Sequence, residues 1–131
     1  MAQKQGSSST AGGRLDGSLA DTAVAANFVL GAGWGGAATI AVTTGSTDQR
    51  GQITITASTT TPAQATATVV HTFAGGAWAA IPWPQMSVTT DQAIDEGRIK
   101  VTSRTTTAAT WPYSVLPVDT KIYIIAYCYT Q

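Results

Sequence analysis

Few residues in this chain of 131 are of the types that carry out catalysis or bind metal ions. His71 is the only histidine and Cys128 the only cysteine, and no acidic residue lies near His71 in the sequence. A nucleophilic cysteine needs a lowered pKa and a third group to orient its base, and the local sequence supplies neither. A single cysteine also excludes an intrachain disulfide and a cysteine-rich zinc site. We therefore expect no enzyme and no cofactor, with His71 hydrogen-bonded within a strand and Cys128 a small buried thiol.

The acidic residues are mostly isolated, except for Asp91, Asp95 and Glu96 in one loop. This loop lacks the Asp/Asn alternation of known calcium loops. Paired carboxylates for glycoside hydrolysis would also need a cleft and a defined separation, which no sequence pattern indicates here. We expect a solvated turn and no metal site.

The run from Gly31 to Gly36 matches the dinucleotide pattern G-x-G-x-x-G. In that motif a helix begins at the third glycine, and its N-terminus holds the pyrophosphate. Here Ala37–Val42 continues as a strand-like run instead. The sequence therefore predicts a glycine hairpin loop and no nucleotide site.

The chain contains four tryptophans, each beside Gly, Pro or Ala: Trp34, Trp78, Trp83 and Trp111. Aromatic side chains at strand ends cover the ends of a core or form a subunit interface. Exposed ones stack on sugars, so glycan contact by these four residues is the alternative.

The elements that must position these residues are short runs rich in Val, Ile, Thr and aromatics, separated by Gly, Pro, Asp or Ser. They predict an all-β fold, an antiparallel β-sandwich that is jelly-roll-like, over residues 23–131. The expected strands are Val24–Leu30, Ala37–Thr43, Gln52–Ala57, Ala65–Phe73, Trp78–Ile81, Gln85–Thr90, Arg98–Arg104, Thr110–Leu116 and Lys121–Tyr129.

Alternation along individual strands indicates which side chains share a face. Ile53 and Ile55 share one face of their strand. Ile99 and Val101 share another, opposite the polar face of Arg98, Lys100, Thr102 and Arg104. The prolines of Ile81–Pro84 donate no ladder hydrogen bond, so this stretch should form a sheet edge or a kink.

The last strand is apolar or aromatic on both faces. One face carries Tyr123, Ile125, Tyr127 and Tyr129, and the other carries Ile122, Ile124, Ala126 and Cys128. A strand covered on both faces is either central in a closed fold or flanked by another subunit. We favour the second explanation, with the face of Tyr123, Ile125, Tyr127 and Tyr129 at a subunit interface, because tyrosine hydroxyls tolerate partial hydration.

Residues 1–22 are dominated by Gln, Ser, Gly and Thr, and only Leu15 and Leu19 offer apolar anchors. They predict an extended or flexible N-terminal arm, either a disordered tail or an arm that orders on a partner. The first residues lack the apolar segment of a secretory signal. The uncharged stretch from Thr22 to Val42 is too rich in glycine for a membrane helix, so no membrane partner is expected.

The balance of basic and acidic residues indicates which classes of partner the protein can bind. Seven basic and seven acidic residues give a net charge of zero, and only 11% of residues are charged. Nucleic-acid binding relies on Lys and Arg neutralising phosphates, so no nucleic-acid partner is expected. A surface with zero net charge favours association into an assembly.

Several segments together resemble a family of β-sandwich domains in tailed-bacteriophage virion proteins. The resemblance extends from Thr39 to Gln131 and is carried by Ser46–Ile55, Val70–Ala74, Pro82, Ser87–Thr89 and Ile122–Tyr127. Members of this family form the trimeric tips of tail or head fibres and small capsid decoration proteins.

The resemblance implies a homotrimer without a cofactor, located on the capsid surface of the virion after synthesis in the host cytoplasm. Fibre proteins carry a long shaft before the tip, whereas here only a short arm precedes the sandwich. We therefore expect a capsid decoration protein that stabilises the assembled head and binds the major capsid protein through Lys4, Arg14, Leu15 and Leu19. The alternative is a fibre tip that binds a host-surface glycan.

Overall fold

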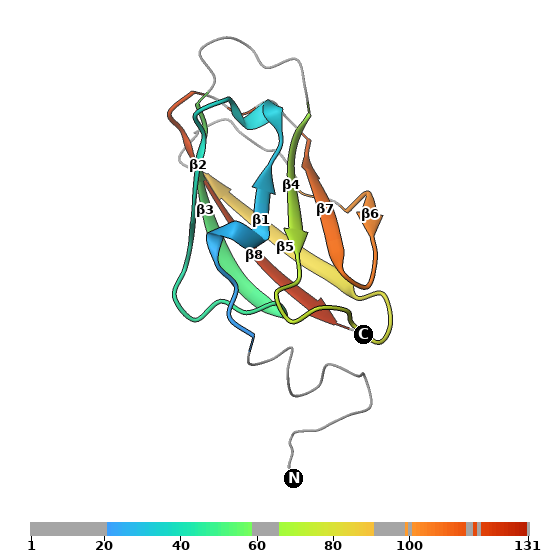
Figure 1. Ribbon diagram of the computed structural model, residues 1–131. Helices are drawn as coiled ribbons and strands as arrows, with labels where there is room; N and C mark the ends of the chain where they lie inside the picture. The colour runs from blue at the N-terminus through green and yellow to red at the C-terminus, as the bar shows by residue number, and fades with distance from the viewer. Residues whose placement is uncertain are drawn as a thin grey trace.

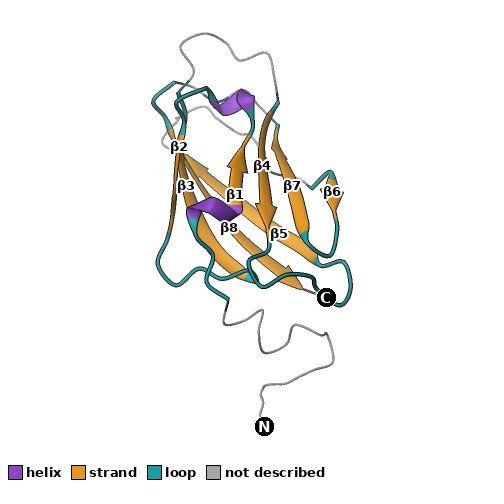
Figure 2. Ribbon diagram, viewed as in Figure 1, coloured by secondary structure: helices purple, strands orange, loops and turns teal. Residues whose placement is uncertain are grey.

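The strand-like runs of the sequence form eight β-strands in the part of the chain that the computed structural model describes, residues 21–58, 66–90, 99, 101–114, 117 and 119–130 (Figure 1). They are β1 Phe28–Leu30, β2 Thr39–Val42, β3 Arg50–Thr56, β4 Ala67–Thr72, β5 Trp83–Thr90, β6 Ser103–Arg104, β7 Ala108–Tyr113 and β8 Ile122–Thr130. Two single turns of 3-10 helix, η1 Ala25–Asn27 and η2 Ala32–Trp34, flank β1 (Figure 2). No helix in the described ranges is long and apolar enough to cross a membrane.

The strands form two antiparallel four-stranded sheets, which pack face to face as layers of a sandwich (Figure 1). One sheet has the order β1-β4-β7-β6 and the other the order β2-β3-β8-β5. The pairs β2–β3 and β6–β7 are direct neighbours within a sheet, whereas the other consecutive strands belong to different sheets. The predicted antiparallel β-sandwich is confirmed.

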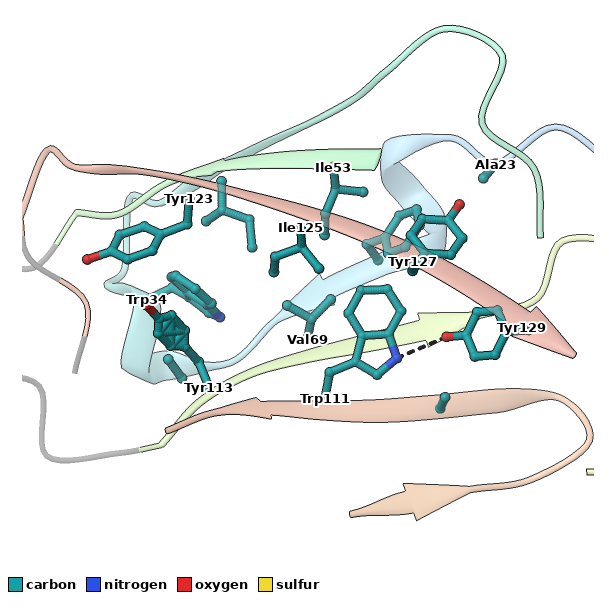
Figure 3. Close-up of a cluster of buried hydrophobic side chains, with 14 of the residues drawn as sticks. Ala23, Trp34, Ile53, Val69, Trp111, Tyr113, Tyr123, Ile125, Tyr127 and Tyr129 are labelled. Atoms are coloured by element: carbon teal, nitrogen blue, oxygen red, sulfur yellow. Dashed lines mark hydrogen bonds between the residues drawn. The ribbon is translucent and has the colours of Figure 1, made fainter. Parts of the chain in front are cut away.

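Alternate residues of each strand face the opposite sheet and form the core between the layers (Figure 3). Ile53 and Ile55 of β3 are fully buried there, as their alternation predicts. Ile99 and Val101 pack against this core and are partly buried. The core is unusually aromatic, since it includes Trp34, Trp78, Trp111, Phe28, Phe73, Tyr113, Tyr123, Tyr127 and Tyr129.

The tyrosine face of β8 lies inside the sandwich, so the predicted subunit interface at Tyr123, Ile125, Tyr127 and Tyr129 is wrong. All four side chains are buried within one chain. β8 is an inner strand between β3 and β5, and these side chains reach across to the opposite sheet. Tyr123, for example, packs edge-on to Tyr113 with ring centroids 5.3 Å apart (Figure 3). Large aromatic rings fill the gap of about 10 Å between stacked sheets without help from a second subunit.

Three local predictions also differ from the structure. Trp78–Ile81 forms no strand, and of Val24–Leu30 only Phe28–Leu30 does, because Asn27 accepts a hydrogen bond from the Val24 amide and closes η1. The glycine run holds η2, and it crosses between sheets rather than forming a hairpin. No helix able to bind a pyrophosphate follows it, since β2 begins at Thr39.

The position of Pro84 agrees with the expectation for prolines. It lies in β5, which is an edge strand of its sheet, so its missing N–H interrupts no second ladder. At the other end of the sandwich from η2, the chain joins the fold at residues 21 and 22. Thr22 bridges to Thr47, and the Asp48 amide donates to the Asp21 carbonyl over 3.2 Å.

Candidate functional site

The most concentrated polar chemistry in the described chain surrounds Asp48, a fully buried carboxylate. Its two oxygens accept hydrogen bonds from the Ala74 amide at 2.8 Å and the Gly75 amide at 2.7 Å. Asp48 lies between β2 and β3, whereas Ala74 and Gly75 follow β4 in the other sheet. Asp48 therefore joins the two sheets at one end of the sandwich.

Beside Asp48, two side-chain hydrogen bonds link Trp111, Tyr129 and His71 within the aromatic core. Trp111 Nε1 donates to the Tyr129 hydroxyl over 2.9 Å (Figure 3). That hydroxyl lies 3.1 Å from His71 Nδ1. Tryptophan only donates, so the Tyr129 proton is free to point at His71. His71 Nε2 lies 3.8 Å from Asp48 Oδ1, which is beyond hydrogen-bond range. The ring of Phe28 stacks on His71 with centroids 4.3 Å apart.

Tyr127 forms a second polar link in this region. Its hydroxyl donates to the Thr47 carbonyl over 2.6 Å. Gly51 leaves room for this bond, because a Cβ there would lie 2.7 Å from the Tyr127 hydroxyl and would collide with Ser46. Tyr127 therefore holds the turn before β3 in place. The sequence pattern alone did not identify the Thr47 carbonyl as its partner.

This network resembles a catalytic arrangement only in its residue types. Asp48, His71 and Tyr129 are all fully buried, so none of them reaches a substrate from solvent. Burial raises the pKa of the Tyr129 phenol, and the hydrogen bond from Trp111 offsets only part of this rise. Burial and then the charge of Asp48 raise the pKa of Tyr127. Neutral phenols held this way stabilise the fold, and we interpret the network as structural.

The raised tyrosine pKa values predict a loss of stability in alkali. In the unfolded chain tyrosine titrates near about 10, so above that pH the unfolded state releases protons that the folded state retains. The free energy of unfolding should then fall by about 1.4 kcal/mol per pH unit for each such tyrosine, and stay independent of these groups below about pH 9. Urea unfolding between about pH 7 and 11 measures the slope. The Tyr129→Phe variant should show a shallower decline, and an identical slope would contradict this assignment.

The histidine and the cysteine do not come together. His71 faces the core from β4, whereas Cys128 is half-buried on the outer face of β8. No group of three or more His, Cys, Asp or Glu in the described residues is arranged to hold a metal ion. The acidic loop of Asp91, Asp95 and Glu96 lies outside the described residues, as do Lys4, Arg14, Leu15 and Leu19 of the arm.

The tryptophans divide three to one between core and surface. Trp34, Trp78 and Trp111 are buried, so the alternative role of glycan contact is wrong for these three. Trp34 and Trp111 are held by hydrogen bonds from their ring nitrogens to the Thr68 carbonyl and the Tyr129 hydroxyl. Only Trp83, 62% exposed, can stack on a ligand from solvent.

Trp83 forms one wall of a groove at the open side of the sandwich, where β5 and β6 end the two sheets. The groove encloses about 320 Å³ and is lined by Trp83, Pro84, Met86, Ile99, Val101 and Arg104. The guanidinium carbon of Arg104 lies 4.0 Å from the centre of the Trp83 ring. Its Nη1 donates to the Pro82 carbonyl over 2.9 Å.

Alternation from Ile99 predicted that Arg104 would point away from this groove, and that prediction is wrong. Ile99 pairs with Tyr113, whereas Arg104 pairs with Ala109, so the segment from Ile99 to Arg104 contains one more residue than the facing part of β7. Such a bulge shifts the later side chains to the other face. Arg104 therefore lies on the same side as Ile99 and Val101.

The outer face of β8 presents a second candidate surface. We call Ile122, Ile124, Ala126 and Cys128 the β8 outer face; Ile122 is 39% exposed and the other three are half-buried. The register places Gln52, Thr54 and Thr56 of β3 on one side, and Gln85, Ser87 and Thr89 of β5 on the other. These flanking residues are uncharged, but Arg50 at the start of β3 lies directly opposite Cys128 at one end of this face.

Comparison with protein-family models, curated proteins and solved structures found no match to this chain.

Proposed function

We propose that this protein is a structural component of a tailed-bacteriophage virion, a capsid decoration protein that binds the assembled head as a homotrimer. The observation that carries the proposal is the combination of a closed aromatic core with an outer face of β8 that is apolar and is flanked by uncharged residues except for Arg50 at one end. Because the polar groups of the core are buried, a partner can contact only the surface of the sandwich. An apolar face with a single charge at its end is suited to burial against another protein.

The β8 outer face is the surface we assign to the seam between subunits. The last strand is apolar on both faces, and its tyrosine face is already covered by the opposite sheet. The face with Ile122 and Ile124 is therefore the one that gains from a partner, at about 25 cal/mol for each Å² of apolar area removed from water. Zero net charge removes long-range repulsion between copies.

We assign contact with the major capsid protein to the arm, through Lys4, Arg14, Leu15 and Leu19. The polar composition of residues 1–20 supports this assignment, because such a segment gains order on a partner surface rather than on its own. Binding only to the assembled lattice stabilises that lattice by mass action.

The Ile124→Glu variant should be monomeric. A carboxylate at the centre of an apolar seam loses its hydration without gaining a partner, which costs several kcal/mol per subunit. Analytical ultracentrifugation measures the native mass of the wild type and of the variant. Val29→Glu is the matched control, since Val29 is 59% exposed on the outer face of the other sheet. A wild-type monomer, or an Ile124→Glu trimer, would contradict the assigned seam.

Deletion of residues 2–20 should abolish co-sedimentation with assembled heads and leave the number of subunits in the free oligomer unchanged. The two variants thus separate the two surfaces: one loses self-association, and the other loses head binding. Far-UV circular dichroism confirms that both remain folded. Undiminished head binding by the truncated protein would refute the role of the arm.

The alternative function, a glycan-binding fibre tip, keeps one specific observation in its favour. Trp83 is exposed beside Arg104 in the groove between β5 and β6. A decoration protein can carry such a site as well, so the groove does not by itself favour a fibre tip over a decoration protein.

A further inference from the structure

The groove between β5 and β6 combines an exposed aromatic ring with a fixed cation. Trp83 is the most exposed of the large hydrophobic side chains in the described part of the chain, at 62%. Arg104 is half-buried and stacks on it at 4.0 Å. Stacking a guanidinium on an indole is favourable, and it holds both groups in one orientation before any ligand arrives.

Among the described residues, the guanidinium of Arg104 makes one hydrogen bond. A guanidinium has five N–H donors in a planar fork. One of them is taken by the Pro82 carbonyl. No carboxylate of the described residues contacts Arg104, and the rest of the groove lining is uncharged. An arginine fixed in this way, with most of its donors not used by any described residue, is suited to bidentate binding of a carboxylate.

The remaining walls set the size and character of the ligand body. Pro84, Met86, Ile99 and Val101 give the groove apolar sides. Its volume of about 320 Å³ is at the small end of ligand sites, which suits a single ring rather than a length of peptide. The face of an indole is electronegative, and the C–H bonds on one face of a pyranose ring are weakly positive, so the two stack.

We propose that the groove between Trp83 and Arg104 binds a carboxylate-bearing sugar residue, such as a sialic or uronic acid of a glycan. The carboxylate pairs with the remaining donors of Arg104. The C–H face of the sugar lies against Trp83 and the apolar walls, and its hydroxyls stay in water at the open side. This site goes beyond head binding and does not depend on it.

The test is a titration of the full-length protein with sialyllactose and with trigalacturonic acid, followed by two-dimensional NMR. Lactose is the matched neutral probe, because it lacks the carboxylate of sialyllactose. We expect saturable shifts of the Trp83 indole resonance with at least one acidic probe, and at least about tenfold weaker binding of lactose.

Three variants test which side chains bind. Trp83→Ala and Arg104→Gln should each weaken binding of the acidic probe at least about tenfold. Arg104→Lys keeps the charge but loses the planar fork, and should weaken binding as well. Arg50→Gln is the control, since Arg50 is an exposed arginine on β3, and it should bind like the wild type. Thermal unfolding establishes that each variant is folded.

Three results would overturn the proposal. One is no saturable shift with either acidic saccharide; another is equal binding of lactose and sialyllactose. The third is binding that survives both Trp83→Ala and Arg104→Gln. Binding of a glutamate-rich peptide without binding of either saccharide would assign the groove to acidic peptides and would also refute the sugar assignment. Head binding by Arg104→Gln should stay intact, which separates this site from the decoration function.

Discussion

The Trp111→Ala variant should lose about 3–5 kcal/mol of its free energy of unfolding. Trp111 is fully buried on β7 and contacts aromatic rings from both sheets, with the Tyr127 ring centre at 5.5 Å and that of His71 at 5.6 Å. Its removal leaves a large cavity and also takes away the donor to the Tyr129 hydroxyl. Since domains of this size are stable by only about 5–15 kcal/mol, the variant should be close to unfolding at physiological temperature.

Chemical denaturation of two further variants separates the effect of the buried ring from that of its N–H group, and compares a buried with an exposed tryptophan. Trp111→Phe keeps a ring but removes the N–H, and should cost less than Trp111→Ala. Trp83→Ala removes the same side chain from the surface, and should change the free energy of unfolding by no more than about 0.5 kcal/mol. Equal losses for Trp111→Ala and Trp83→Ala would contradict the division of the tryptophans between core and groove.

The Asp48→Ala variant should lose about 3–6 kcal/mol, because it loses two hydrogen bonds to a buried charged group and each contributes about 1.5–3 kcal/mol. The substitution leaves the amides of Ala74 and Gly75 without their acceptor and separates the loop after β4 from the turn before β3. It also removes the carboxylate that faces His71 Nε2. Urea unfolding at neutral pH measures the change.

Asp119→Ala provides the comparison for Asp48→Ala. Asp119 is a half-buried carboxylate in the turn before β8, and its loss should change stability by less than about 0.5 kcal/mol. Asp48→Asn should fall between the two, since an amide offers one acceptor where the carboxylate offers two. A neutral effect of Asp48→Ala would show that the two sheets hold this end of the sandwich together without it.

Much of the fold follows from the sequence where one face of a strand is polar. In β3 the threonines oppose Ile53 and Ile55, so the period of two fixes both the strand and its buried face. Pro84 marks an edge strand for an equally local reason, its missing donor. These signals depend on neighbours within the same strand, and they therefore agree with the structure.

The sequence was less informative where both faces of a strand are apolar. Along β8 the pattern shows two equivalent faces, and it contains nothing to say that Tyr123 and Tyr127 turn inward while Ile122 and Ile124 turn outward. That choice depends on the facing layer, where Tyr113 and Trp111 of β7 and Trp34 of η2 provide aromatic partners of matching size. The tyrosine face was consequently assigned to a subunit seam.

The sequence did not predict the groove with Trp83 and Arg104, because the register between residues 99–104 and β7 changes by one residue. Strict alternation from Ile99 sends Arg104 to the polar face, whereas one extra residue before Ser103 brings it onto the face of Ile99 and beside Trp83. A bulge depends on pairing with the neighbouring strand, which a single sequence does not reveal. Asp48 was missed for a similar reason, because its partners at residues 74 and 75 are distant in sequence.

Electron microscopy of phage heads tests the proposed function most directly. Heads purified with and without the protein should differ by one sandwich-sized density per subunit, arranged around local threefold positions on the outer capsid surface. The truncation of residues 2–20 should remove that density, whereas Arg104→Gln should keep it. Density found only at the tips of fibres, or heads that are identical with and without the protein, would contradict the assignment as a decoration protein.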